Sequence, residues 1–125
     1  MPRAAVPRAC RFFDVLHSVL YTRGVLPICG ALLPAILAST GQFRQITAQN
    51  VYVPIGGWHS DPGMQRVGKA FRGFIRRYAH SMMPFLVEAG LCEEEVDDLV
   101  KGLMFDLRRA SGVVCVYHTV HARKA

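Results

Sequence analysis

The sequence lacks the short motifs that mark the common nucleotide-dependent and hydrolytic enzymes. It contains no GxGxxG or P-loop for phosphate groups, no GxSxG motif for a nucleophilic serine and no HExxH zinc motif. Its four cysteines are scattered and none forms a CxxC pair, which argues against a structural zinc site. From these absences we expect this chain to hold no metal and no cofactor by itself, and we name no catalytic residue.

Charged residues are also few. They make up 19% of the chain against 51% for hydrophobic residues, so we expect a folded core rather than a disordered chain. Lys and Arg number 15 and Asp and Glu number 9, and the net charge of +6 favours anionic partners. A chain of 125 residues this apolar needs no disulfide, so we interpret Cys10, Cys29, Cys92 and Cys115 as reduced thiols of a cytoplasmic protein.

A long uninterrupted apolar run is missing as well. The most apolar stretch, residues 24–41, is interrupted by Pro27 and Pro34. A membrane span needs about 20 apolar residues, so this stretch predicts a buried helix and no membrane span. The acid-free, arginine-containing N-terminus resembles a mitochondrial transit peptide only faintly, because Pro2 and Pro7 interrupt it and serine is absent.

Hydrophobic periodicity predicts an α+β fold with four helices and two strands in the order ααβααβ. The expected helices cover residues 11–23, about 26–39, about 67–90 and 92–109, and the strands lie within 43–56 and 113–120. We expect residues 1–10 to be a flexible N-terminus and residues 11–125 to form a single domain. Ile46 falls out of the apolar alternation that follows it, which predicts an irregular start or a bulge in the first strand.

The last predicted strand is apolar on both of its faces. Such a strand is typical of an interior position in a sheet, although only one other strand is visible in the sequence. The predicted core comprises Leu16, Leu20, Leu32, Ile36, Val53, Phe71, Ile75, Phe85, Leu99, Leu103, Val114 and Val116.

The order of four short segments resembles the C-terminal part of fungal class I S-adenosylmethionine-dependent methyltransferases of the secondary-metabolism type. In that family a strand ends in VPIGxW, a helix follows a DP…G segment, the next helix begins GxxxEEV, and the chain closes on an RK tail. The corresponding residues here are Val53 to Trp58, Asp61-Pro62 with Gly68, Gly90 with Glu94-Glu95-Val96, and Ala122-Arg123-Lys124. The resemblance covers about residues 11–125.

The resemblance implies the C-terminal half of a Rossmann-like sheet. The two strands would be antiparallel neighbours, with the strand in 43–56 at the edge and the last strand inserted between two others. The N-terminal helices would match a cap over the substrate pocket. The family binds its cofactor with a Gly-rich loop after the first strand and an acidic residue after the second, and this chain has neither. The resemblance therefore implies a partial or degenerate methyltransferase that supplies substrate-pocket elements and is inactive alone, from a truncated or mis-predicted gene or a degenerate paralogue.

Tyr21, Trp58 and His59 are the predicted substrate contacts, because they flank the expected pocket side. His59 and Asp61 share a loop and could act as an acid–base pair, although a plain polar loop is the favoured interpretation. The main alternative function is a stand-alone, non-catalytic module that binds a small molecule, or pairs with a second copy or a full-length methyltransferase through an exposed sheet edge.

A second alternative is a basic nucleic-acid-binding module. Arg72, Arg76 and Arg77 lie within six residues on the third predicted helix, and clustered cations of this kind bind backbone phosphates. The neighbouring aromatic residues have core spacing rather than that of an exposed stacking face, so this reading is disfavoured.

Overall fold

A computed structural model describes residues 5–26 and 29–125, with the side chain of Cys29 excepted. The described chain contains helices α1 (Pro7–Thr22), α2 (Cys29–Ser39), α3 (Pro62–Glu88) and α4 (Glu93–Arg109), and strands β1 (Phe43–Pro54) and β2 (Val114–Lys124). The predicted α+β fold, its order ααβααβ and the antiparallel pairing of the two strands are confirmed. No helix within the described ranges combines the length and apolarity that a membrane crossing requires.

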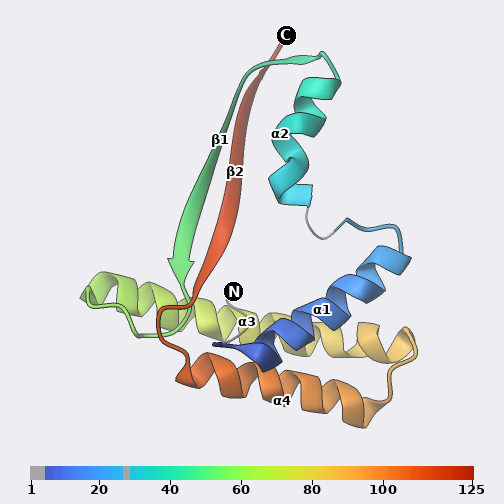
Figure 1. The fold of residues 1–125 in the computed structure, drawn as a ribbon, viewed down its shortest axis with the longest axis vertical. Helices are drawn as coiled ribbons and strands as arrows, with labels where there is room; N and C mark the ends of the chain where they lie inside the picture. Colours follow the sequence, from blue (N-terminus) through green and yellow to red (C-terminus); the bar gives the residue numbers. More distant parts are fainter. Residues whose placement is uncertain (1–4, 27–28) are drawn as a thin grey trace.

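Helices α1, α3 and α4 lie side by side and form a base, which holds the core (Figure 1). The apolar stripes of α3 and α4 recur at three- and four-residue spacing, so each helix turns one face inward. The largest fully buried side chains of the base include Phe12, Leu16, Leu86, Leu103 and Leu107. The predicted core residues Leu16, Ile75, Leu99 and Leu103 are buried here, as expected.

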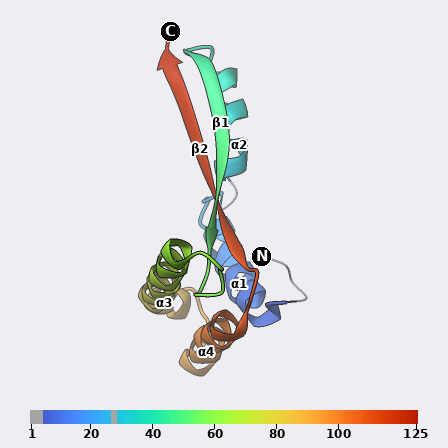
Figure 2. The same ribbon diagram turned by 90° about the vertical axis from the view of Figure 1, so that its left-hand side faces the viewer.

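Strands β1 and β2 and helix α2 form an arm that projects from the base (Figures 1 and 2). The two strands pair in one antiparallel register from Pro54 with Val114 to Thr47 with His121. Helix α2 packs against one face of this ribbon, close enough that a Cβ on Gly30 would lie 3.2 Å from the His118 ring. One face of the arm is therefore covered by α2, and at its foot the ribbon also meets α3, where Tyr117 contacts Phe71.

The irregular start predicted for the first strand is confirmed. The register shifts between Arg44 and Thr47, and Gln45 adopts a positive φ of 52° there. The extra residue moves Ile46 out of phase with the strand that follows, which explains its break in the alternation.

The predicted burial of the last strand is wrong for the described chain. Strand β2 has β1 as its one neighbour in a two-stranded sheet, and Val116 is 38% exposed. The predicted core residues Leu32 and Ile36 are also exposed, at 45% and 43%. These side chains are apolar by sequence but stay exposed because a single helix on a two-stranded ribbon can cover only part of either surface.

The N-terminal helix starts earlier than the sequence predicted. It begins at Pro7 rather than Arg11, and Val6, Ala9 and Cys10 are buried, so residues 6–10 are not loose. The remaining part of the predicted flexible N-terminus, residues 1–4, lies outside the described residues. The second helix was expected from about Leu26, but Leu26 is not helical and α2 begins at Cys29, while residues 27–28 lie outside the described residues.

A distant carboxylate holds the beginning of α1 in place. Asp106 Oδ2 accepts the backbone N–H of Arg8 at 2.6 Å and that of Ala9 at 3.0 Å. The first N–H groups of a helix have no acceptor within the helix. The Asp106 carboxylate on α4, which is only 8% exposed, supplies that acceptor for both of these N–H groups. Because the two segments are 97 to 98 residues apart, periodicity in the sequence gave no sign of this contact.

Candidate functional site

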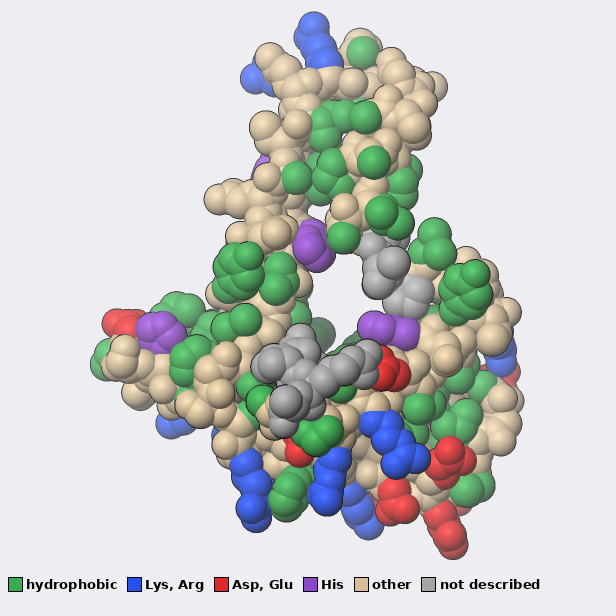
Figure 3. Space-filling model, in the orientation of Figure 1, with side chains coloured by type: hydrophobic (Ala, Val, Ile, Leu, Met, Phe, Trp, Pro, Cys, Tyr) green, Lys and Arg blue, Asp and Glu red, His purple; other side chains and the backbone are tan. Residues whose placement is uncertain are grey.

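A cavity of about 760 Å³ opens at the foot of the arm, between α1, α3 and β2. In the space-filling view the molecule is hollowed between arm and base, and hydrophobic and histidine side chains border the hollow (Figure 3). The aromatic side chains that line the cavity are Phe13, Phe71, Phe74, Tyr78 and Tyr117. A volume of this size and an apolar lining with few polar groups are typical of small-molecule sites. We call this space the aromatic cavity.

The aromatic wall of this cavity is built by helical spacing. Phe71, Phe74 and Tyr78 lie three and four residues apart, so their rings share one face of α3. Ring centroids are 5.7 Å apart between Phe71 and Phe74 and 6.4 Å apart between Phe74 and Tyr78, with interplanar angles of 22° in both pairs. Strand β2 completes the wall, since Tyr117 meets Phe71 edge-on at 5.8 Å.

Two of these rings remain open to solvent. Phe74 is 49% exposed and Tyr117 is 45% exposed. Exposed rings at the mouth of an apolar cavity offer a flat surface on which an aromatic ligand gains stacking contacts. The arrangement is therefore suited to a planar, largely apolar molecule.

Polar side chains at the cavity include residues of α1 and β2. Asp14 and His17 line it from α1, and the His17 ring lies 6.1 Å from that of Phe13. Cys115 lines it from β2, and burial raises the pKa of its thiol. A thiol with a raised pKa stays protonated near neutral pH, which makes Cys115 a poor nucleophile, as its apolar strand setting predicted.

Trp58 and His59 lie together in the loop between β1 and α3. Their rings are 5.6 Å apart, and the Trp58 indole N–H donates to the carbonyl of Val113 at 3.1 Å. The His59 carbonyl accepts a hydrogen bond from the side chain of Gln65 at 2.7 Å. These contacts fix the loop against the start of α3 and the foot of β2.

The predicted His59–Asp61 pair is joined through backbone rather than through the carboxylate. The N–H of Asp61 donates to His59 Nδ1 at 3.0 Å, while Asp61 Oδ2 accepts the N–H of Met64 and caps α3. An N-cap carboxylate satisfies a helix donor that has no partner within the helix. This geometry gives the Asp61 carboxylate a structural role at the start of α3.

Tyr21 lies apart from the other two predicted contacts. It is 68% exposed near the C-terminal end of α1, at the other end of the base from the loop between β1 and α3 (Figure 1). The residues that line the aromatic cavity do not include Tyr21, Trp58 or His59. The aromatic spacing of α3 is visible in the sequence, but spacing of this kind predicts core, because nothing in it indicates that the facing surface is open.

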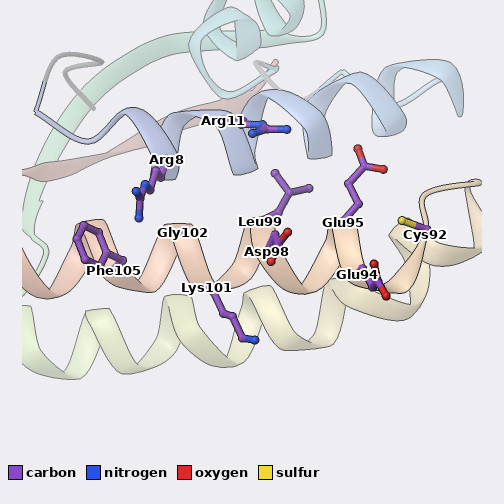
Figure 4. Close-up of a pocket in the computed structure, with 10 residues that line it drawn as sticks. All are labelled: Arg8, Arg11, Cys92, Glu94, Glu95, Asp98, Leu99, Lys101, Gly102 and Phe105. Atoms are coloured by element: carbon purple, nitrogen blue, oxygen red, sulfur yellow. The ribbon is translucent and has the colours of Figure 1, made fainter.

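A second hollow runs between α1 and α4 (Figure 4). It measures about 650 Å³, and Arg8 and Arg11 of α1 line it opposite α4. Arg8 lies toward Phe105, away from the acidic first turns of α4 (Figure 4). The guanidinium of Arg8 lies 4.5 Å from the centre of the Phe105 ring, and that of Arg109 lies 4.3 Å from it. Charges of both signs line this groove and compensate one another, so it favours no ligand class.

A third groove, of about 530 Å³, lies between α3 and α4 and is mainly basic. Arg76, His80, Arg108 and Arg109 line it together with Asp97. The predicted cationic cluster is divided, since Arg76 lines this groove while the half-buried Arg72 approaches Gly56 in the β1–α3 loop. Across residues 5–26 and 29–125, no group of three or more potential metal ligands comes together.

Comparison with known proteins gives no relative, since no protein-family model, curated protein or solved structure matches this chain.

Proposed function

We propose that this chain supplies the substrate-binding side of a methyltransferase-type site and that the aromatic cavity binds a planar, largely apolar small molecule. The observation that carries the proposal is the cavity itself, with five aromatic side chains and two half-exposed rings at its mouth. Its position between α1 and the foot of the arm agrees with the substrate-pocket role that the resemblance implies for these segments.

Different residues of the cavity would contact different parts of the ligand. The rings of Phe74 and Tyr117 would hold the flat face of the ligand, because both are exposed and both contact Phe71. His17 would meet a polar substituent, since it is the histidine that lines the cavity. No residue here is assigned a step in methyl transfer.

S-adenosylmethionine, the cofactor of the resembled family, has no fitting cradle in the described residues. The glycine-rich loop at Gly56 and Gly57 is the best candidate, but the backbone of Gly68 and the side chain of Lys69 already fill the space beside it. A Cβ on Gly57 would lie 2.6 Å from Lys69 Cε. We therefore derive no step through the cofactor.

Binding of a neutral planar probe tests this function. We expect N-phenyl-1-naphthylamine to titrate the full chain with saturable fluorescence at one site. Phe74→Ala and Tyr117→Ala should each weaken its affinity about fivefold, the size of a lost aromatic contact. Phe105→Ala is the matched control, because Phe105 is 40% exposed but lies outside the cavity.

Three results of these titrations would overturn or narrow the proposal. Probe binding that is not saturable, or that falls equally in Phe105→Ala, would overturn the proposal. The variant Trp58→Ala in the same titration tests the predicted contact at Trp58, where unchanged affinity removes that residue from the site. Calorimetric titration with S-adenosylmethionine should give no heat of binding, and a saturable isotherm would overturn the assignment of a substrate-binding part alone.

A further inference from the structure

The outer edge of β2 is a strand edge without a neighbour in the described chain. The sheet there has two strands, and β1 occupies only the inner edge of β2. The N–H of Ile55 donates to the carbonyl of Val113 at 3.0 Å. Because such bonds alternate along an antiparallel pair, odd-numbered residues of β2 face β1 and even-numbered residues direct their backbone groups outward. The open edge therefore consists of Val114, Val116, His118, Val120 and Ala122.

The outer edge of β1 is protected in a way that the β2 edge is not. Pro54 falls on an outward-facing position and has no N–H to donate, and the bulge at Gln45 disrupts the other end. Proline and bulges are the devices by which proteins block pairing at sheet edges. Strand β2 contains no proline, and its residues 114–122 carry no Lys, Arg, Asp or Glu. Of the two edges, β2 is the one open to a partner.

The β2 edge is complementary to itself. In an antiparallel pairing centred on His118, Val116 of one copy lies opposite Val120 of the other, and Val120 lies opposite Val116. All three are outward-facing positions, so the pairing satisfies backbone donors and acceptors on both copies. A two-fold axis through this centre makes both halves of the contact identical, as in most homodimers.

The same pairing places the two α2 helices on one face of the enlarged sheet. The His118 ring contacts Gly30, so the even-numbered side chains of β2 face α2. A two-fold axis perpendicular to the sheet keeps each copy's α2 on that shared face. Helix α2 lies nearer to β1 than to the outer edge of β2, so it leaves that edge open (Figure 2). It carries no charged residue that would oppose the association.

The paired edge is mainly a backbone contact, to which the 38% exposed side chain of Val116 adds apolar surface. A two-stranded ribbon is also marginal alone, whereas four strands with an apolar face are not.

We propose that two copies of this chain associate through the outer edges of β2, in the antiparallel register centred on His118, to form a four-stranded sheet in the order β1-β2-β2-β1. This interface goes beyond the binding of a small molecule, because it uses the outer backbone edge of β2, which shares only Val114 and Val116 with the lining of the aromatic cavity. Val120 lies outside that lining, so a substitution at Val120 separates loss of the dimer from loss of probe binding.

Two proline substitutions at one cross-strand pair test the proposal. Ala48 and Val120 are register partners, and each has its N–H directed to an outer edge. Val120→Pro removes a donor from the β2 edge, and Ala48→Pro does the same on the β1 edge. Sedimentation velocity should give a dimer for the full chain and for Ala48→Pro. The dimer dissociation constant should rise at least about tenfold in Val120→Pro, because the symmetric contact is lost twice.

Amide hydrogen exchange keeps the test decisive if Val120→Pro does not fold. In the unaltered chain the amides of Val116, His118 and Val120 should be protected, and their protection should fall on dilution. The amides of Ala48 and Asn50 on the β1 edge should exchange fast throughout. A monomer at all concentrations, a dimer that is insensitive to Val120→Pro, or equal exchange on both edges would overturn the proposal.

Discussion

Gly56 and Gly68 form a close backbone contact that joins the loop after β1 to helix α3. The N–H of Gly56 donates to the carbonyl of Gly68 at 2.9 Å, and Gly56 has a positive φ of 93°. A Cβ on Gly68 would overlap the carbonyl oxygen of Gly56. Glycine at position 68 is therefore required for the close approach of the β1–α3 loop to α3 at the foot of the arm.

Gly68→Ala should lower the free energy of unfolding by about 3 kcal/mol, since the clash is with backbone, which cannot move aside as a side chain can. Urea denaturation followed by circular dichroism measures this change. Gly73→Ala on the same helix is the control. Its Cβ would meet only Arg77 Nη1 at 3.6 Å, and alanine should stabilise the helix by up to about 1 kcal/mol. Equal effects of the two substitutions would contradict the role of the close contact.

Asp106→Ala should destabilise the protein by about 2–3 kcal/mol, because it leaves the buried N–H of Ala9 and the N–H of Arg8 without their acceptor. Thermal unfolding measures the loss. Asp98→Ala, at an exposed position on the same helix, should change stability by less than about 0.5 kcal/mol. An equally small effect at Asp106 would mean that α1 begins without help from α4.

The thiol of Cys115 should react slowly with iodoacetamide at pH 8, because burial raises its pKa and keeps it protonated. Cys92 is exposed and should be alkylated at least about tenfold faster, as read by peptide mass spectrometry. The folded state holds this thiol proton more tightly than the unfolded state does. The free energy of unfolding should therefore fall as the pH rises above the unfolded thiol's pKa of about 8.5. Alkylation of Cys115 as fast as that of Cys92 would contradict this protected setting.

Local patterns in the sequence were enough to predict the elements. The 3.6-residue spacing of Val96, Leu99, Leu103 and Leu107 specified α4, and the acidic start and basic end of that segment placed its bounds within a residue or two. The out-of-phase Ile46 even located the bulge. These features depend on residues within one or two turns of each other, which is why periodicity reveals them.

Local patterns of this kind did not predict the candidate site. The aromatic cavity joins Phe13, Phe74 and Tyr117, which lie far apart in the chain. Their spacing is the same whether the rings face a core or a cavity. The predicted contacts Trp58 and His59 follow two glycines in a loop, and the structure places that loop beside the cavity lining rather than within it.

By itself, the sequence determined the order ααβααβ and the apolar faces of α3 and α4, because these follow from side-chain periodicity along a continuous segment. Only the tertiary structure decided that Leu32, Ile36 and Val116 stay exposed and that Asp106 holds the start of α1. The physical reason is that hydrophobicity specifies which side chains favour burial. Whether another helix or strand covers those side chains depends on contacts between segments that are distant in the chain. An apolar arm with one covering helix and one open strand edge is the result of that difference.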